Sequence, residues 1–337
     1  MPGSLMAAEM AEQPERLAQL IGRRSTIAAV LGPLLDGVAG TVIVARGSSD
    51  HAATVGRYLL EMATRRPVAS ASPSVLDLYH VDTSFTGYLV VGVSQSGQTP
   101  EISRYLEHAA HRGARTVAVT NDASSPLATL AQAVVELRVG EERAVPATKT
   151  VTAELVGFGL LAAAAGAGPS PEDWARLPEQ VAAVLSDPDP VDDLADWLLD
   201  ARRLATVARG LLFGAAQETS LKLQETASLL ATAFSAADLR HGPIALAGSG
   251  IPVLAMAHPG AACADTLDLC ATLSARGADV RLIGPVAGAS CGWDAGAPEM
   301  LAPVLAVVRA QQLAHRLSLL LGLDPDHPAG LSKVTPT

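Results

Sequence analysis

The stretch Tyr88-Leu-Val-Val-Gly-Val-Ser-Gln-Ser-Gly-Gln-Thr-Pro100 has an apolar first half and a polar second half. The run Tyr88–Val93 is continuous in apolar side chains, which is the pattern of a parallel strand buried on both faces. The polar residues that follow predict a loop, and residues 101–112 predict a helix. Strand, polar loop and helix in this order indicate an α/β fold with a parallel sheet.

The same order recurs on both sides of this stretch. Residues 41–45 predict a buried strand, Gly47-Ser48-Ser49 a loop, and residues 50–65 a helix. Further strands are predicted at 116–120 and 135–139, and Pro146-Ala-Thr-Lys-Thr150 begins a long apolar helix that runs to about residue 165. Backbone N–H groups at the start of a helix bind anions well. The two loops therefore predict a phosphate site built from neutral donors: Gly47, Ser48, Ser49, Ser94, Gln95, Ser96 and Thr99.

Two short matches indicate that the chain contains the same unit twice. Val44-Ala-Arg-Gly47 recurs as Val207-Ala-Arg-Gly210, and Arg112-Gly-Ala114 recurs as Arg276-Gly-Ala278. The offsets are 163 and 164 residues, and matching offsets at two separate points favour a repeat. In the second copy we predict strands at 205–208, 251–256 and 280–283. Helices are predicted at 213–230 and 304–321, and a further helix is predicted to run through residue 275.

These patterns predict an α/β protein of two tandem, doubly wound parallel-sheet subdomains with helices on both faces. The expected boundaries are an N-terminal helical segment (1–40), a first subdomain (41–166), a linker with its own helix (167–195), a second subdomain (196–323) and a C-terminal tail (324–337). Gly32-Pro33 is expected to end the N-terminal helix.

Composition narrows the possible partners. The chain has 337 residues, of which 49% are hydrophobic and 17% charged, and its net charge is −10. No run of basic residues offers a footprint for nucleic acid. No signal peptide is visible, and the most apolar segment, 155–168, is too short and too rich in glycine to span a bilayer. Three cysteines without metal-ligand spacing predict reduced thiols and no metal site. The lack of a visible signal peptide or membrane span predicts a cytoplasmic location, and no cofactor is expected.

The segment Ser220–Pro243 carries candidate groups for proton transfer. Lys222 and Glu225 fall on one face of a predicted helix, and His241 follows on a loop. A lysine, a carboxylate and a histidine suit proton transfer at a sugar carbon. Such a trio in isolation is more often a surface ion pair beside a loop histidine, and the other motifs of the chain favour the catalytic interpretation. The chain contains only three lysines, Lys149, Lys222 and Lys333. A lysine kept among so many arginines suggests a role in losing a proton, forming an imine or placing a compact ammonium.

The order and spacing of these motifs resemble the sugar isomerase (SIS) family. Within it, the chain is similar to the isomerase half of glucosamine-6-phosphate synthase and to the stand-alone glucosamine-6-phosphate deaminases. The resemblance covers nearly the whole chain and rests on these motifs: Glu12-Gln-Pro14, Gly47-Ser-Ser49, Ser94–Thr99, Ala147-Thr-Lys149, Leu221–Glu225, His241-Gly-Pro243 and Leu331-Ser-Lys333. It implies a twin flavodoxin-like SIS fold and a homodimer whose active site lies at the subunit interface.

The resemblance also implies roles for single residues. Ser48, Ser49 and the loop residues Ser94, Gln95, Ser96 and Thr99 look like ligands of a sugar phosphate, with Gly47 and Ala147 beside them. His241, commonly supplied by the neighbouring subunit, would open the sugar ring. Glu225 matches the carboxylate that moves a proton between C1 and C2, Lys222 its assistant at the C1 hydroxyl, and Lys333 a tail lysine that reaches the site.

Three departures from the family pattern bear on the reaction. No glutaminase segment precedes residue 12, so free ammonia would have to replace glutamine in any synthesis. A polar His-Ala-Glu segment late in the catalytic helix is replaced by Leu230-Ala-Thr232, and the serine that usually precedes Thr-Lys is Ala147.

Several functions fit the sequence. The first is a deaminase/isomerase that converts glucosamine 6-phosphate to fructose 6-phosphate and ammonia. The second is a dehydratase acting on N-acetylglucosamine 6-phosphate, since an amide nitrogen does not readily form the imine needed for deamination and Leu230-Ala-Thr232 suits an acetyl group. A fructosyl-amine-phosphate deglycase and a non-catalytic sugar-phosphate sensor are the remaining alternatives.

Overall fold

The computed structural model describes residues 1–333, which fall into two compact units. The five-stranded unit comprises Glu15–Glu142, Lys149–Ala175 and, at the end of the described chain, Ser332 and Lys333. The four-stranded unit comprises Met1–Pro14, Arg143–Thr148 and Arg176–Leu331. Each unit has its own parallel sheet and its own hydrophobic core, so each is described separately.

The five-stranded sheet has the strand order β2-β1-β3-β4-β5, and all its neighbouring pairs are parallel. Its strands are β1 (Gly40–Val44), β2 (Val68–Ser70), β3 (Tyr88–Val93), β4 (Arg115–Thr120) and β5 (Ala133–Glu136). This order is that of the flavodoxin-like doubly wound fold, in which ligands bind beyond the carboxyl ends of the strands.

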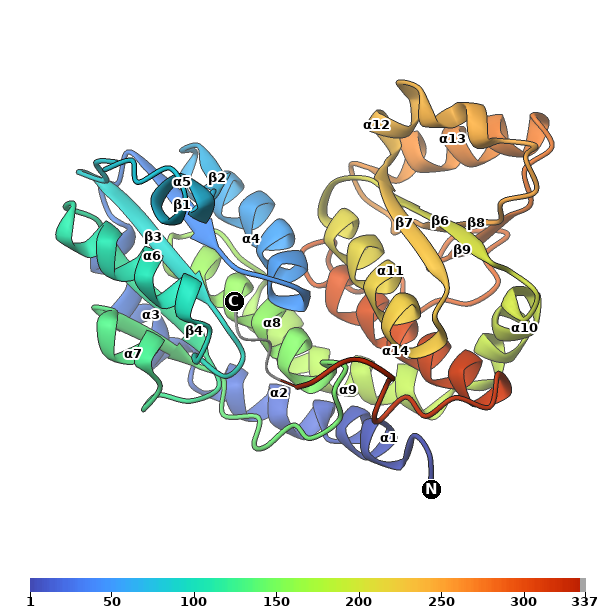
Figure 1. Ribbon diagram of the computed structural model, residues 1–337, viewed down its shortest axis with the longest axis horizontal. Coiled ribbons are helices and arrows are strands. Elements are labelled where there is room, and N and C mark those ends of the chain that lie inside the picture. Colours follow the sequence, from blue (N-terminus) through green and yellow to red (C-terminus); the bar gives the residue numbers. More distant parts are fainter. Residues whose placement is uncertain (334–337) are drawn as a thin grey trace. The chain divides into compact units, whose positions relative to one another are not determined.

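Helices cover both faces of this sheet (Figure 1). One face carries α4 (Ser48–Thr64) and α8 (Lys149–Ala164), which pack on each other, and α3 (Arg24–Leu35) packs on α8. The other face carries α5 (Pro73–Asp77), α6 (Pro100–His111) and α7 (Pro126–Leu130), and it is filled by buried residues of which Val90, Ile102 and Leu106 are examples. Most side chains of α8 are buried, because the helix is covered by the sheet and by neighbouring helices. This accounts for its almost continuous apolar sequence.

The four-stranded sheet has the order β7-β6-β8-β9 and is also parallel throughout. Its strands are β6 (Arg203–Ala208), β7 (Leu230–Ser235), β8 (Val253–Met256) and β9 (Val280–Ile283). Helices α11 (Phe213–Ala227) and α14 (Ala302–Leu320) pack together on one face, with α10 (Asp189–Leu198) against α14. Helices α12 (Ala236–Arg240) and α13 (Cys263–Ala275) lie over the other face (Figure 1).

The register of the strands confirms the internal repeat. Val42 pairs with Val90 in the first sheet, and Ala205 pairs with Val253 in the second, so both strands are displaced by 163 residues. From β4 to β9 the displacement is 164, because α13 has 13 residues where α6 has 12. The counterpart of β5 is reduced to a single bridge between Ile283 and Cys291.

The N-terminal segment differs from the prediction. Gly32-Pro33 does not end a helix, since α3 continues to Leu35 with Pro33 inside it. Leu31 and Leu35 are both buried on that helix, and their packing offsets the backbone hydrogen bond that proline cannot donate. The sequence pattern also missed α1 (Ser4–Ala11), while α2 (Gln13–Gly22) covers part of the predicted helix. Gln13 is fully buried and donates to the side chain of Gln311, 3.0 Å away.

Two further predictions are wrong, one in the second copy and one in the linker. The helix predicted to reach residue 230 ends at Ala227, because Ser228 adopts a left-handed conformation (φ +51°) and the N–H of Leu229 bonds to the carbonyl of Leu223. Residues 230–232 therefore belong to the edge strand β7, which the sequence analysis missed. The Asp-rich segment 187–193 was predicted as irregular linker, but α10 begins within it, at Asp189. The helix predicted within the linker is present as α9 (Pro171–Ser186).

Glycine allows the close approach of α4 and α8, and its replacement provides a test of this packing. A Cβ added at Gly56 would lie 2.3 Å from the ring of Phe158. We expect Gly56→Ala to lower the free energy of unfolding by about 1–3 kcal/mol through overpacking. Gly22→Ala is the matched control, since nothing lies within 4 Å of the added carbon at that helix end. Urea unfolding of both variants measures the effect, and equal stabilities would contradict the packing described.

Candidate active site

A buried ammonium lies between two carboxylates on α11. The side chain of Lys222 is fully buried, with its Nζ atom 3.3 Å from Oε1 of Glu218 and 2.5 Å from Oε2 of Glu225. Spacings of three and four residues put all three groups on one face of the helix. Glu218 is as buried as the lysine, whereas the Glu225 side chain is 20% exposed. Glu225 is thus the member of the cluster that a ligand in solution can reach.

The two carboxylates decide the charge of Lys222. Burial by itself lowers the pKa of Lys222, but the charges of Glu218 and Glu225 and their hydrogen bonds outweigh it, so the pKa lies above its ordinary value. The charged form therefore contributes stability below the ordinary lysine pKa, and this contribution is lost only as pH rises through the raised one. At neutral pH Lys222 is a proton donor and a positive charge, which disfavours an imine at this residue.

His241 lies on the surface of the same unit. It follows the last residue of α12, and its N–H bonds to the carbonyl of Asp238. Gly242 comes next with φ +133°, a conformation that favours glycine, and so turns the chain away from the helix. The imidazole is exposed and makes no hydrogen bond or ion pair with the described part of the chain. It is therefore accessible to a ligand or to a second protein molecule.

The loop between β3 and α6, in the five-stranded unit, gathers hydroxyl side chains at the start of a helix. The hydroxyls of Ser94 and Thr99 lie 3.1 Å apart, and Oγ of Ser96 accepts from the N–H of Gln98 at 3.2 Å. Gly97 has φ +62°, and a Cβ there would lie 2.0 Å from Oγ of Ser125. The O–H of Ser96 and one O–H of the Ser94–Thr99 pair remain available to donate to a phosphate.

Ser49 does not fit the donor role predicted for it. Its Oγ donates to Oε1 of Glu154 at 2.8 Å, and both residues are buried. A serine has one O–H to donate, so the hydroxyl of Ser49 is already committed. Gly47 precedes α4 with φ +58° and is exposed, and Ser48 is the first residue of that helix. In this loop the backbone N–H groups are the better candidates for anion contacts.

Another buried carboxylate, that of Glu142, joins the Ser94–Thr99 loop to the tail. Glu142 is 6% exposed, and its Oε2 accepts from Nε2 of Gln95 at 3.0 Å and from Nζ of Lys333 at 2.7 Å. The structure thus brings Gln95 and Lys333 together through a residue that the sequence analysis did not select. Ala147 is half-buried and lies in the 143–148 segment of the four-stranded unit.

Three acidic residues of these sites were missed from the sequence. Glu218 stands four residues before Lys222, so helical spacing could have identified it. Glu154 is a lone acid within the apolar run of α8, which is also a readable signal. Glu142 stands beside the equally acidic Glu141 before a turn, and nothing in the sequence separates the buried carboxylate from the exposed one.

The second repeat does not reproduce the phosphate loop. With an offset of 163, Ser94–Thr99 corresponds to Ala257–Ala262, which keeps the glycine but has no hydroxyl side chain. Oε2 of Glu299 accepts from the N–H of Ala261 at 3.1 Å, and a Cβ on Gly260 would lie 2.3 Å from that carboxylate. His258, at the position of Gln95, is bound on both nitrogens by Trp293 and Ala297, and burial lowers its pKa despite the nearby acids. An internal carboxylate therefore stands where an anion would bind.

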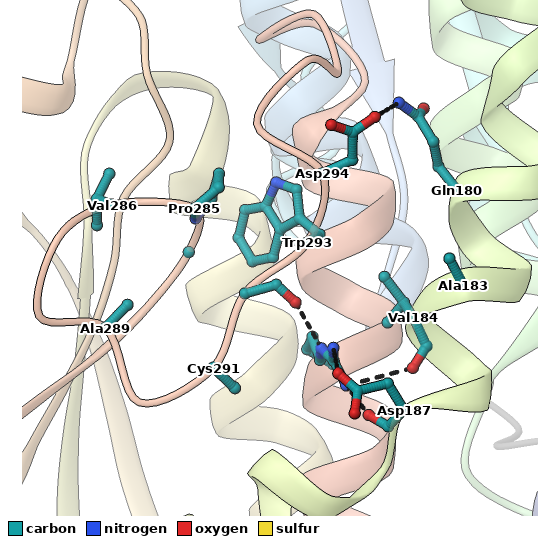
Figure 2. Close-up of a pocket in the computed structure, with 13 residues that line it drawn as sticks. Gln180, Ala183, Val184, Asp187, Pro285, Val286, Ala289, Cys291, Trp293 and Asp294 are labelled. Carbon is teal, nitrogen blue, oxygen red and sulfur yellow. Dashed lines mark hydrogen bonds and ion pairs between the residues drawn. The ribbon is translucent and has the colours of Figure 1, made fainter.

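A cavity of about 500 Å³ lies beyond the carboxyl end of β9 in the four-stranded unit (Figure 2). It is lined by α9, by the segment from Gly284 to Asp294 and by Arg309. The guanidinium of Arg309 is occupied by the carboxylate of Asp187 and by backbone carbonyls, as the dashed lines in Figure 2 show. None of the predicted site residues lines this cavity.

The remaining features concern cysteines, metals and membranes. The three thiols are free, and burial raises the pKa values of Cys270 and Cys291 to about 11, which makes them poor nucleophiles. Within residues 1–333 no group of three histidine, cysteine or acidic side chains is arranged to hold a metal ion. No helix of the described chain is long and apolar enough to cross a membrane.

Comparison with models of protein families identifies the family to which the two α/β units belong. The family model for the SIS domain matches residues 40–164 and 197–288, which together make up more than half of the chain. The chain belongs to the SIS family. The two matched segments contain the two parallel sheets and the helices that connect their strands.

Curated relatives of this SIS protein are longer than the chain. Glutamine–fructose-6-phosphate aminotransferase [isomerizing] from Methanothermobacter thermautotrophicus is 31% identical over 336 residues, covering 97% of the chain and 56% of the relative. The enzyme of the same name from Gloeobacter violaceus is 33% identical over 356 residues, covering 97% and 58%. The chain thus spans a little over half the length of the curated relatives it matches.

Solved structures agree on the fold. A proposed phosphosugar isomerase from Silicibacter pomeroyi DSS-3 has a TM-score of 0.86 at 31% identity, covering 97% of the SIS chain and 100% of that protein. Glucosamine-6-phosphate deaminase from Thermotoga maritima has a TM-score of 0.77 at 22% identity, covering 99% and 100%. At that identity the second comparison supports the fold alone.

The different surroundings of the serines lead to a testable contrast. We expect Ser49→Ala to lower the free energy of unfolding by about 1–3 kcal/mol, because Glu154 loses a buried donor. Ser96→Ala should instead leave stability nearly unchanged and weaken phosphate binding. Urea unfolding and phosphate titration by calorimetry measure the two effects. Loss of phosphate affinity in Ser49→Ala without loss of stability would contradict the role assigned to its hydroxyl.

Proposed function

We propose that this chain is a sugar-phosphate enzyme that opens the ring of glucosamine 6-phosphate and moves a proton from C2 to C1, releasing fructose 6-phosphate and ammonia. The observation that carries the proposal is the cluster Glu218–Lys222–Glu225, in which a partly exposed carboxylate is paired with a buried ammonium. Similarity to the isomerizing aminotransferases supports the substrate class.

In the proposed reaction the loop Ser94–Thr99 binds the phosphate and His241 transfers the proton that opens the ring. Glu225 then removes the C2 proton from the open-chain aldehyde, and the ammonium of Lys222 stabilises the negative charge that develops on O1. Return of the proton to C1, with a second proton passing from the amino group to O1, gives the C2 imine and a C1 hydroxyl. Addition of water to that imine releases ammonia and leaves the ketone. The atoms balance with water as the only co-reactant.

The proposed role of His241 depends on a second copy of the chain, and that of Lys333 depends on the position of the C-terminal tail. The exposed imidazole of His241 suits delivery to a second copy of the chain, so we propose a homodimer as the working form. Lys333 is proposed to act near the sugar carbons, since its ammonium already lies beside the phosphate-loop residue Gln95 through Glu142.

Dehydration of N-acetylglucosamine 6-phosphate loses part of its support. It depended on an apolar Leu230-Ala-Thr232 segment late in the catalytic helix, but these residues form the start of edge strand β7, and Leu230 is 61% exposed. Dehydration therefore becomes an outcome that the following experiment separates from deamination.

Proton NMR in deuterated buffer tests the reaction with both sugars. We expect glucosamine 6-phosphate to give fructose 6-phosphate and ammonia with exchange at the transferred position, and Glu225→Gln to lower the rate by at least ~100-fold, as loss of a general base does. Glu172→Gln, an exposed acid on α9, is the control. An unsaturated product from the acetylated sugar alone would replace deamination by dehydration, and undiminished exchange in Glu225→Gln would remove Glu225 from the mechanism.

The raised pKa of Lys222 predicts that this residue does not form an imine. Treatment with borohydride during turnover, followed by peptide mass spectrometry, reports any lysine joined to the sugar. We expect no adduct on Lys222 at any pH between about 6 and 9, since an ammonium is not a nucleophile. A substrate adduct on Lys222 would contradict the role of a permanent positive charge.

A further inference from the structure

Glu142 has an unusual concentration of donors around one buried carboxylate. Oε1 accepts from the N–H of Thr150 at 3.1 Å, and Oε2 accepts from the hydroxyl of Thr150 at 2.7 Å. Oε2 also accepts from Gln95 and Lys333. These donors belong to three residues of the five-stranded unit, from separate parts of its chain: the phosphate loop (Ser94–Thr99), the start of α8 and the C-terminal tail.

The chemistry of these partners requires an ionised carboxylate. Each of the four groups donates a hydrogen bond, and a carboxylate accepts without donating. Since Oε2 is shared by Thr150, Gln95 and Lys333, a change at one of them alters the acceptor available to the other two. The contact to Gln95 also consumes one N–H of its amide, which limits the orientations that the amide can take towards a ligand.

We propose that Glu142 is a positioning residue that couples the phosphate loop to the tail lysine. Glu142 holds Gln95 and Lys333 in one network, so a phosphate bound at Ser94–Thr99 and the placement of Lys333 stabilise each other. Such a coupling is reciprocal by thermodynamic linkage. If bound phosphate stabilises the contact of Lys333 with Glu142, that contact raises the affinity for phosphate by the same factor. The kinetic consequences of this inference rest on the proposed function, whereas its structural consequences do not.

A purely structural role gives a different pattern. The bonds to Thr150 cap the first turn of α8, and a carboxylate kept only for that purpose would affect stability without affecting the tail. Measurements of the free energy of unfolding do not separate the two roles. Measurements of hydrogen exchange in the segment that ends at Lys333 do.

Hydrogen exchange of the tail, followed by mass spectrometry with and without inorganic phosphate, tests the coupling. In the unchanged protein we expect phosphate to slow exchange in the peptide that ends at Lys333. In Glu142→Gln that peptide should exchange several-fold faster and respond no longer to phosphate. Glu141→Gln, which alters the adjacent exposed acid, should behave like the unchanged protein. Unchanged tail exchange in Glu142→Gln would overturn the proposal.

Lys333→Met provides a second variant that leaves the buried carboxylate in place. We expect it to reproduce the loss of phosphate response and to weaken phosphate binding about 3- to 10-fold, within the usual range of coupling between sites. If its phosphate affinity equals that of the unchanged protein, the coupling is absent.

Kinetics then add a test that requires the proposed reaction. Glu142→Gln should raise KM through Gln95 and lower kcat through Lys333, and adding Lys333→Met to it should lower kcat little further, because both changes break one network. Full additivity of the two kcat effects would contradict the shared network. If glucosamine 6-phosphate is not turned over at all, the proposed function fails, while the exchange experiment still decides the role of Glu142.

Discussion

The ammonium of Lys222 is buried between Glu218 and Glu225 in the four-stranded unit, and this ion cluster constrains the rest of that unit. An isolated charge at such a depth is strongly disfavoured, and removal of one partner of a buried pair typically costs about 3–5 kcal/mol. Helix α11 must therefore keep its three charged residues on one face and keep Lys222 and Glu218 buried there. Its packing against α14 does so, with the hydroxyl of Thr226 bonded to the carbonyls of Lys222 and Ala314. The charge balance of α11 thus depends on three side chains of one helix.

The repeat shows how one backbone supports two kinds of chemistry. Helices α4 and α11 follow the first strand of each copy, and each packs on a long buried helix, α8 or α14. Yet α11 carries the ion cluster, while α4 begins with Ser48 and Ser49. The hydroxyl of Ser49 donates to the buried Glu154 of α8. The loop after the third strand keeps its hydroxyls in the first copy only. In the second copy Glu299 occupies the N–H group of Ala261, so the hydroxyl-rich loop belongs to one copy and the ion cluster to the other.

Sequence reasoning predicted what depends on local pattern. Buried strands, polar loops and the matching offsets were enough to predict two parallel sheets, since these signals are continuous along the chain. Helix ends were harder: the left-handed Ser228 carries no glycine signal, and Pro33 is tolerated because Leu31 and Leu35 are buried by neighbours distant in sequence. The partners of the candidate residues were largely hidden for the same reason. The contact from Ser49 to Glu154 spans 105 residues and that from Glu142 to Lys333 spans 191, and no local pattern specifies either.

The charge of Lys222 is the central claim, and the small number of lysines makes it directly measurable. Labelling with lysine enriched in ¹⁵N at Nζ gives at most three side-chain signals, and loss of one signal in Lys222→Arg assigns it. We expect the Lys222 nitrogen to keep the chemical shift of an ammonium through pH ~10.4, the ordinary midpoint for lysine, and to titrate above it. Glu225→Gln should lower that midpoint. A neutral amine at Lys222 near pH 8 would contradict the ion cluster and the mechanism derived from it.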